Sequence, residues 1–185
     1  DPLSAAGASR RSAVAPFIAM DVKSAANALE AAGRRVLHLE IGEPGARTPE
    51  RVRDAARAAL DEERIGYTEA LGWRPLRERI ARHYGEHYGV EIPAGRVAIT
   101  TGSSAGFNLA FLAAFDHGDR VAIASPGYPA YRNILGALGL HVVELPTAAR
   151  DRHVITPEML ERAHASAPLA GVLVASPGNP TGTLM

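Results

Sequence analysis

Cysteine is absent from this 185-residue chain, and lysine occurs once, as Lys23, among 20 basic residues. The lack of cysteine excludes a disulfide framework, thiolate zinc sites and a cysteine nucleophile. Acidic residues also number 20, so there is no net charge to attract nucleic acid or an anionic membrane. We therefore expect no nucleic-acid and no membrane partner, and a small molecule as the ligand.

Long hydrophobic runs are missing as well. No stretch reaches the length of a membrane span, and Arg10 and Arg11 are not followed by the apolar core of a secretion signal. From these absences we expect a cytoplasmic protein. The hydrophobic content of 46% is enough for one sizeable buried core.

Short apolar or β-branched runs alternate with helical patterns along the chain. Strands are expected at residues 36–41, 97–101, 121–124, 141–145 and 171–175. Thr-Pro-Glu at 48–50 and again at 156–158 predicts two helix starts, because Thr can cap free N–H groups and Pro suits the first helical position. This alternation predicts an α/β fold with three layers, α-β-α, around a mainly parallel sheet.

Two further patterns bear on the organisation of the chain. Residues 103–115 are apolar nearly all round, which predicts a helix enclosed inside a domain. Gly-Glu-Pro-Gly within 42–48 interrupts the pattern and predicts a boundary. We expect residues 1–46 to form an N-terminal arm and a small-domain segment, and residues 47–185 to begin a larger domain.

Residues 99–107, Ile-Thr-Thr-Gly-Ser-Ser-Ala-Gly-Phe, run from a predicted strand through small residues into a predicted helix. Free N–H groups at that helix start, the helix dipole and the hydroxyls of Ser103 and Ser104 would together suit a phosphate dianion. Gly and Ser also form ordinary tight turns, so both interpretations stay open. The segment matches neither a P-loop nor a Rossmann glycine pattern.

Two more segments follow predicted strands, at the rim where open α/β sheets bind ligands. Ser125–Tyr131 carries Tyr128, whose ring could stack on a flat heterocycle or merely cover the underside of the loop. Ala175–Gly182 contains two Pro and two Gly close together, which would present the amide of Asn179 at a fixed angle or simply make a turn.

Several of these segments together resemble the class I/II aminotransferases, fold-type-I enzymes that use pyridoxal 5′-phosphate (PLP). Ser-Pro-x-Asn-Pro-Thr-Gly at 176–182 resembles the signature of that family. Ile-Gly-Glu-Pro at 41–44, and Tyr-Thr-x-x-x-Gly-x-x-x-Leu-Arg-x-x-Ile at 67–80, resemble its upstream elements. The resemblance covers about residues 36–185 and favours the aspartate and aromatic aminotransferases.

The resemblance implies cofactor-binding roles for five residues. Gly102, Ser103 and Ser104 would hold the PLP phosphate, Tyr128 would stack on the pyridine ring, and Asn179 would hydrogen-bond the 3-oxygen of the ring. Tyr128 stands where many relatives have Trp, and Ser104 where many have Lys or Thr. These departures leave the subfamily open.

The resemblance also implies partners. Tyr67 would reach the phosphate of the neighbouring subunit's cofactor, so a homodimer is expected. Gly42 would lie beside the carboxylate of the substrate, and the substrates would be an amino acid and a 2-oxo acid.

The catalytic lysine of the family lies well downstream of Asn-Pro-Thr-Gly. Lys23 lies instead in the amphipathic stretch 17–32, outside any resembling lysine motif. We therefore assign no catalytic residue to this chain and expect a truncated portion of an aminotransferase that is inactive alone.

Three alternatives remain. His83-Tyr-Gly-Glu-His87 spells a motif of inverted zinc metalloproteases, but it coincides with the predicted Leu-Arg helix, so we expect a solvated helix face and no metal. Other fold-type-I PLP enzymes, such as C–S lyases, share the early motifs. Some transcription regulators carry a non-catalytic aminotransferase-like effector domain.

The family resemblance also predicts a cis peptide bond at Ser125-Pro126 or Asn179-Pro180.

Overall fold

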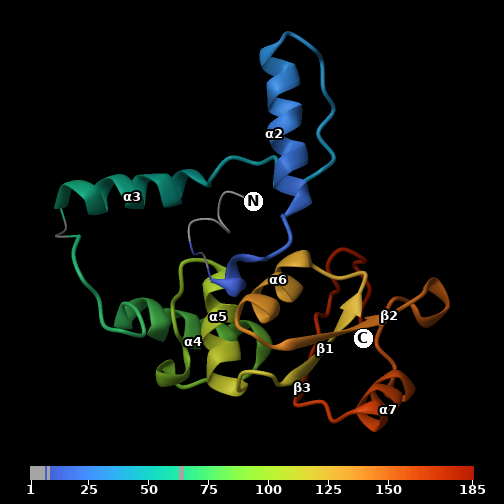
Figure 1. Ribbon diagram of the computed structural model, residues 1–185. Helices are drawn as coiled ribbons and strands as arrows, with labels where there is room; N and C mark the ends of the chain where they lie inside the picture. The colour runs from blue at the N-terminus through green and yellow to red at the C-terminus, as the bar shows by residue number, and fades with distance from the viewer. Residues whose placement is uncertain (1–6, 8, 63–64) are drawn as a thin grey trace. The chain divides into compact units, whose positions relative to one another are not determined.

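The computed structural model describes residues 7, 9–62 and 65–185, which divide into two compact units. The first unit contains the chain up to Ala25 and Gly102–Met185, and the second unit contains Ala26–Thr101. The helices and strands, labelled in Figure 1, are η1 (Arg10–Ser12), α2 (Ile18–Ala31), α3 (Glu50–Glu62), α4 (Arg74–Tyr88), η2 (Ala94–Arg96), α5 (Ser103–Ala114), β1 (Arg120–Ser125), α6 (Pro129–Ala137), β2 (His141–Pro146), η3 (Ala149–Asp151), α7 (Pro157–Ser166) and β3 (Gly171–Leu173).

The sheet of the first unit has three parallel strands in the order β2-β1-β3. In the register of the sheet, Val121 of the central strand lies opposite Val142 of β2 and Gly171 of β3. Val121 and Ala122 are completely buried, so β1 is covered on both faces. The near-continuous apolar sequence of this strand is typical of such a position.

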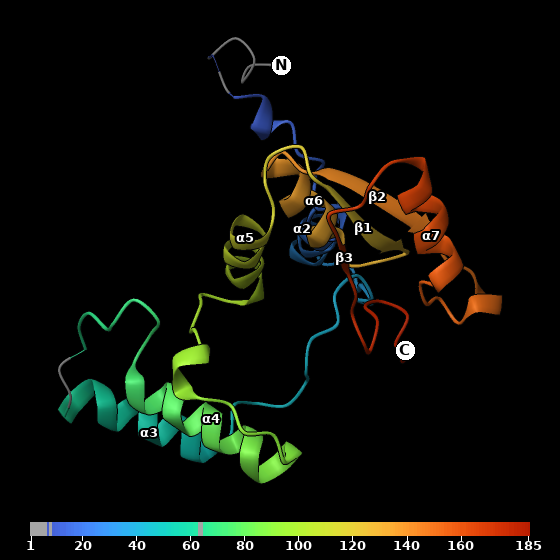
Figure 2. The ribbon, with the colours of Figure 1, turned by 90° about the horizontal axis from the view of Figure 1, so that it is seen from below.

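Helices cover both faces of the sheet because successive side chains of β1 point in opposite directions. Val121 and Ile123 pack with Phe111 of α5 and Leu135 of α6. Ala122 packs on the other side, in a cluster that includes residues of α7. Figures 1 and 2 show α6 and α7 on opposite sides of β1. The predicted α/β fold with a parallel sheet between helical layers is confirmed.

Two predicted strands were wrong. Residues 36–41 and 97–101 have no regular structure and belong to no ladder within the described part of the chain. An apolar β-branched run becomes a strand only when a neighbouring strand takes up its N–H and C=O groups. The third discrepancy is one of length, because β3 ends at Leu173 and not at residue 175.

Residues 103–114 form the predicted helix, but the prediction that this helix is enclosed was wrong. Ser103 does open α5, as expected, and Phe111 is buried against the sheet. Leu109 and Leu112, however, are 59% and 64% exposed. Within the described residues only one face of this helix has a packing partner, whereas the sequence is apolar all round.

The two predicted helix starts and the predicted cis peptide bonds were confirmed. Helix α3 begins at Glu50 and α7 at Pro157, and the hydroxyl of Thr156 accepts a hydrogen bond from the Met159 N–H at 3.4 Å. The Ser125-Pro126 and Asn179-Pro180 bonds are both cis, as is Ser176-Pro177. Among the described helices, none combines the length and the apolarity needed to cross a membrane.

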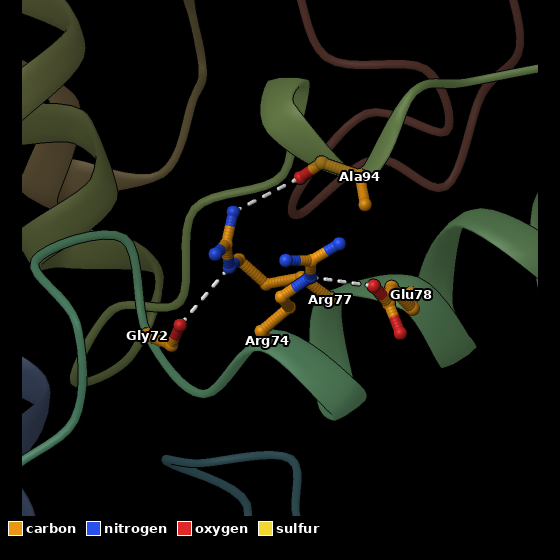
Figure 3. Close-up of polar contacts among 5 residues, drawn as sticks. All are labelled: Gly72, Arg74, Arg77, Glu78 and Ala94. Atoms are coloured by element: carbon orange, nitrogen blue, oxygen red, sulfur yellow. Dashed lines mark hydrogen bonds and ion pairs between the residues drawn. The ribbon is translucent and has the colours of Figure 1, made fainter.

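Arg77 holds the turn around Gly72 in the second unit (Figure 3). Its Nε donates to the carbonyl of Gly72 at 2.9 Å, and its Nη1 donates to the carbonyl of Ala94 at 3.3 Å. Gly72 has φ +95°, and a Cβ there would lie 2.6 Å from Ile99 Cβ, so glycine is required on both grounds. The Gly…Leu-Arg motif therefore has a structural role.

Replacing Arg77 by Ala should lower the free energy of unfolding by about 2–3 kcal/mol, because two half-buried carbonyls lose a charged donor. Arg74→Ala is the matched control: Arg74 pairs with Glu78 at 2.7 Å on the same helix (Figure 3), but the Arg74 side chain is 72% exposed. Its loss should cost about 0.5 kcal/mol or less. Urea unfolding of both variants measures the difference, and equal losses would show that Arg77 is an ordinary surface residue.

His38 lies in the segment without regular structure that precedes Gly42, and it contacts two carboxylates. Its Nδ1 is 2.7 Å from Glu40 Oε1, and its Nε2 is 3.2 Å from Glu30 Oε1. The hydrogen bond with Glu40 and then that with Glu30 raise the pKa of His38 above its ordinary 6.5. The hydrogen bond with His38 lowers the pKa of Glu40 in turn. These contacts join side chains only, so they do not replace the backbone hydrogen bonds that a strand at residues 36–41 would need.

The pKa of His38 should therefore be measurably above its ordinary value in an NMR titration. A raised folded-state pKa means that the folded protein holds the proton more tightly. The stabilisation is thus fully present below the unfolded pKa and is lost as the pH rises through the folded one. Glu40→Gln should move the pKa of His38 down, and a titration that Glu40→Gln leaves unchanged would contradict the pairing.

Candidate functional site

The start of α5 is the first element of the candidate site. Gly102 is its N-cap, with φ +86° and ψ 167°, a conformation that favours glycine. Because Gly102 has no side chain to cap the helix, the N–H groups of the first turn are left to other acceptors. Ser103 and Ser104 occupy the first two helical positions, and both are exposed. The arrangement combines N–H donors, two hydroxyls and the positive end of the helix dipole, which together suit an anion.

Tyr128 is the second element. It follows the carboxyl end of β1 and is the N-cap residue of α6. Its half-buried ring contacts the ring of Phe17 at a centroid distance of 5.9 Å and that of Tyr131 at 5.3 Å, both nearly perpendicular. A shallow hollow beside Tyr128 is lined also by Arg132 and Glu144, which form an exposed ion pair at 3.4 Å.

Asn179 is the third element and lies in the turn that follows β3. The turn is closed by two backbone hydrogen bonds of Gly178, whose N–H donates to Thr183 at 2.8 Å and whose carbonyl accepts from Gly182 at 2.7 Å. Asn179 is itself exposed and borders a cavity that Tyr131 and His153 also line. The Nδ1 atom of His153 is buried there without a hydrogen-bond partner in the described structure.

Tyr131 and Phe17 connect these elements, and neither was predicted as a site residue from the sequence. Tyr131 contacts Tyr128 and also Phe107 of α5, at 5.0 Å, and it borders the cavity at Asn179. Phe17 borders an open groove together with Ser104. The spacing of Tyr131 three residues after Tyr128, on one helix face, could have indicated its role. Phe17 is far away in sequence, and no local pattern marks it.

Gly42 and Tyr67, the other two predicted site residues, belong to the second unit. Gly42 lies in an exposed segment without regular structure, and the side chain of Tyr67 is completely exposed. The site residues of the first unit are therefore Gly102, Ser103, Ser104, Tyr128 and Asn179.

Metal ligands do not gather in the described part of the chain, where no three His, Cys, Asp or Glu residues are placed to share an ion. His83 and His87 lie one turn apart on exposed α4, with their rings stacked at 5.3 Å. Helix α4 continues through Gly85 and ends at Gly89, which adopts the left-handed conformation of a helix C-cap.

Comparison with known proteins identifies the family. The family model for aminotransferase class I and II matches residues 34–185. A valine–pyruvate aminotransferase from Mycobacterium tuberculosis is 51% identical over 175 residues, which are 95% of this chain and 45% of that protein. A crystal structure of an aminotransferase from the same organism superposes with a TM-score of 0.90 at 50% identity, covering 96% of this chain and 46% of that one.

More distant relatives have the same fold. The aspartate aminotransferase of Thermus thermophilus, solved with maleate, has a TM-score of 0.86 at 34% identity and covers 96% of this chain and 46% of that structure. The chain thus spans less than half the length of these relatives. Since the family model matches most of its residues, the chain belongs to the aminotransferase class I and II family.

Proposed function

We propose that this chain is the N-terminal portion of a PLP-dependent aminotransferase that transfers an amino group from an amino acid to a 2-oxo acid in a cytoplasmic homodimer. The match to the family model over residues 34–185 carries the proposal. The start of α5 supports it, because its first-turn N–H groups and the hydroxyls of Ser103 and Ser104, to which the resemblance assigns the cofactor phosphate, suit an anion.

The residues of the first unit suit the phosphate of PLP. In the proposed complex the first-turn N–H groups of α5 and the hydroxyls of Ser103 and Ser104 donate hydrogen bonds to the phosphate oxygens. Gly102 lets the backbone approach closely, since it has no side chain. Where many relatives have Lys or Thr, Ser104 supplies no positive charge, so these three residues would offer the phosphate only hydrogen bonds and the helix dipole.

Tyr128 and Asn179 would hold the ring of the cofactor. Tyr128 offers a flat face for the pyridine, and the side-chain amide of Asn179 donates a hydrogen bond to the 3-oxygen. When bound, PLP supplies an electron sink that stabilises negative charge at the α-carbon of the substrate. The residues of this chain bind and orient the cofactor, and we assign to them no proton transfer.

We also propose for Gly42 and Tyr67 the roles that the resemblance implies. The complete exposure of Tyr67 suits a residue that reaches the cofactor phosphate of a neighbouring subunit, and Gly42 would leave room for the substrate carboxylate. We also retain the domain division: residues 1–46 as arm and small-domain segment, and residues 47–185 as the first part of the cofactor-binding domain.

The complete protein, extended to the length of its relatives, should bind PLP and transfer the amino group of valine to pyruvate. These are the two substrates in the name of the relative that is 51% identical. The 185-residue chain alone should bind PLP weakly and catalyse no transfer, because we assign it no covalent lysine. Visible absorbance after desalting and an alanine-formation assay test both. A complete protein that stays colourless would contradict the proposal and favour a non-catalytic effector domain.

In the complete protein, changing both Ser103 and Ser104 to Ala should weaken PLP binding by about tenfold or more, because each hydroxyl donates to a charged oxygen. Ser166→Ala is the control, since that exposed hydroxyl on α7 donates only to the Ala163 carbonyl, at 2.8 Å. Equilibrium dialysis measures the affinities. Equal affinity for the double variant and the control would place the phosphate elsewhere.

A further inference from the structure

The N-terminal segment 15–17 is held on α6 at two points. The side-chain amide of Asn133 donates a hydrogen bond to the Ala15 carbonyl at 3.1 Å. Two residues later, the ring of Phe17 meets the ring of Tyr128 at 5.9 Å between centroids, with an interplanar angle of 78°. Tyr128 is the N-cap residue of α6 and Asn133 lies in the middle of that helix, so the two contacts fix the segment along it.

Two ring contacts support Tyr128, and they come from different parts of the chain. Tyr131 contacts it at 5.3 Å and 83°, and is itself packed on Phe107, which stacks on the buried Phe111. This support comes from the core of the first unit. The Phe17 contact comes instead from a segment more than a hundred residues earlier in the chain.

The orientation of an aromatic ring depends on such neighbours. The last side-chain torsion of Tyr has a broad energy minimum, so the plane of the ring is set by what packs against it. Two nearly perpendicular contacts restrict that torsion. Phe17 also borders the same open groove as Ser104, so the segment adjoins the residues assigned to both the phosphate and the ring of the cofactor.

We propose that Phe17 is a positioning residue: it fixes the plane of the Tyr128 ring on which the cofactor stacks, so that segment 15–17 pre-organises the site. This inference rests on the proposed function. It adds to that function a residue that touches the stacking ring and not the cofactor.

The test uses the complete protein and pyridoxamine 5′-phosphate, which forms no covalent bond with a lysine and so reports non-covalent contacts. Phe17→Ala should weaken the binding of pyridoxamine 5′-phosphate, measured by calorimetry, about two- to tenfold, which is the effect expected from the loss of one aromatic contact. Phe17→Tyr, which keeps a ring, should restore it. Asn133→Ala, which releases Ala15, should act in the same direction. Met20→Ala, an exposed site on α2, is the control.

A double-mutant cycle separates positioning from general destabilisation. In a Tyr128→Ala background, Phe17→Ala should have no further effect, because the ring that it positions is gone. A Phe17→Ala variant that binds as tightly as the unsubstituted protein, or loses the same factor in both backgrounds, overturns the inference alone. An unsubstituted protein that binds neither PLP nor pyridoxamine 5′-phosphate overturns the proposed function and this inference with it.

Discussion

The burial of β1 on both faces is the constraint on which the first unit depends. Val121 and Ile123 serve one helical layer and Ala122 the other, and the strand also pairs along both edges. Because all three strands are parallel, their carboxyl ends lie at the same end of the sheet, and the segments that follow β1 and β3 both leave the sheet there. That geometry brings Tyr128 and Asn179, about fifty residues apart, to neighbouring places around Tyr131.

Local chemistry made much of this architecture predictable. Thr156 caps α7 and Ser103 opens α5, because capping and small-residue turns depend on a few adjacent residues. Residues 36–41 and 97–101 look like strands by composition, yet a strand also needs a neighbour, which no local pattern supplies. In the same way, the sequence of α5 shows that Leu109 and Leu112 are apolar but not whether anything covers them.

The candidate site shows the same limit. Gly102, Ser103, Ser104, Tyr128 and Asn179 could be selected because each lies in a short motif next to a strand or a helix start. Phe17 could not be selected that way, since its part depends on a ring contact that forms only when distant segments pack together. Tyr131 carries a local signal, its spacing from Tyr128, but its contact with Phe107 also depends on packing. The likeness to relatives identifies the residues of the motifs, and the packing identifies those that support them.

The strand order β2-β1-β3 also affects how the sheet forms during protein synthesis. The central strand leaves the ribosome first, and the residue that pairs with Val121 on its second edge, Gly171, follows about fifty residues later. At roughly 5–20 residues per second, translation leaves this edge without its partner for several seconds. During that interval β1 presents apolar side chains and an open edge, at which another chain could pair and aggregation could begin.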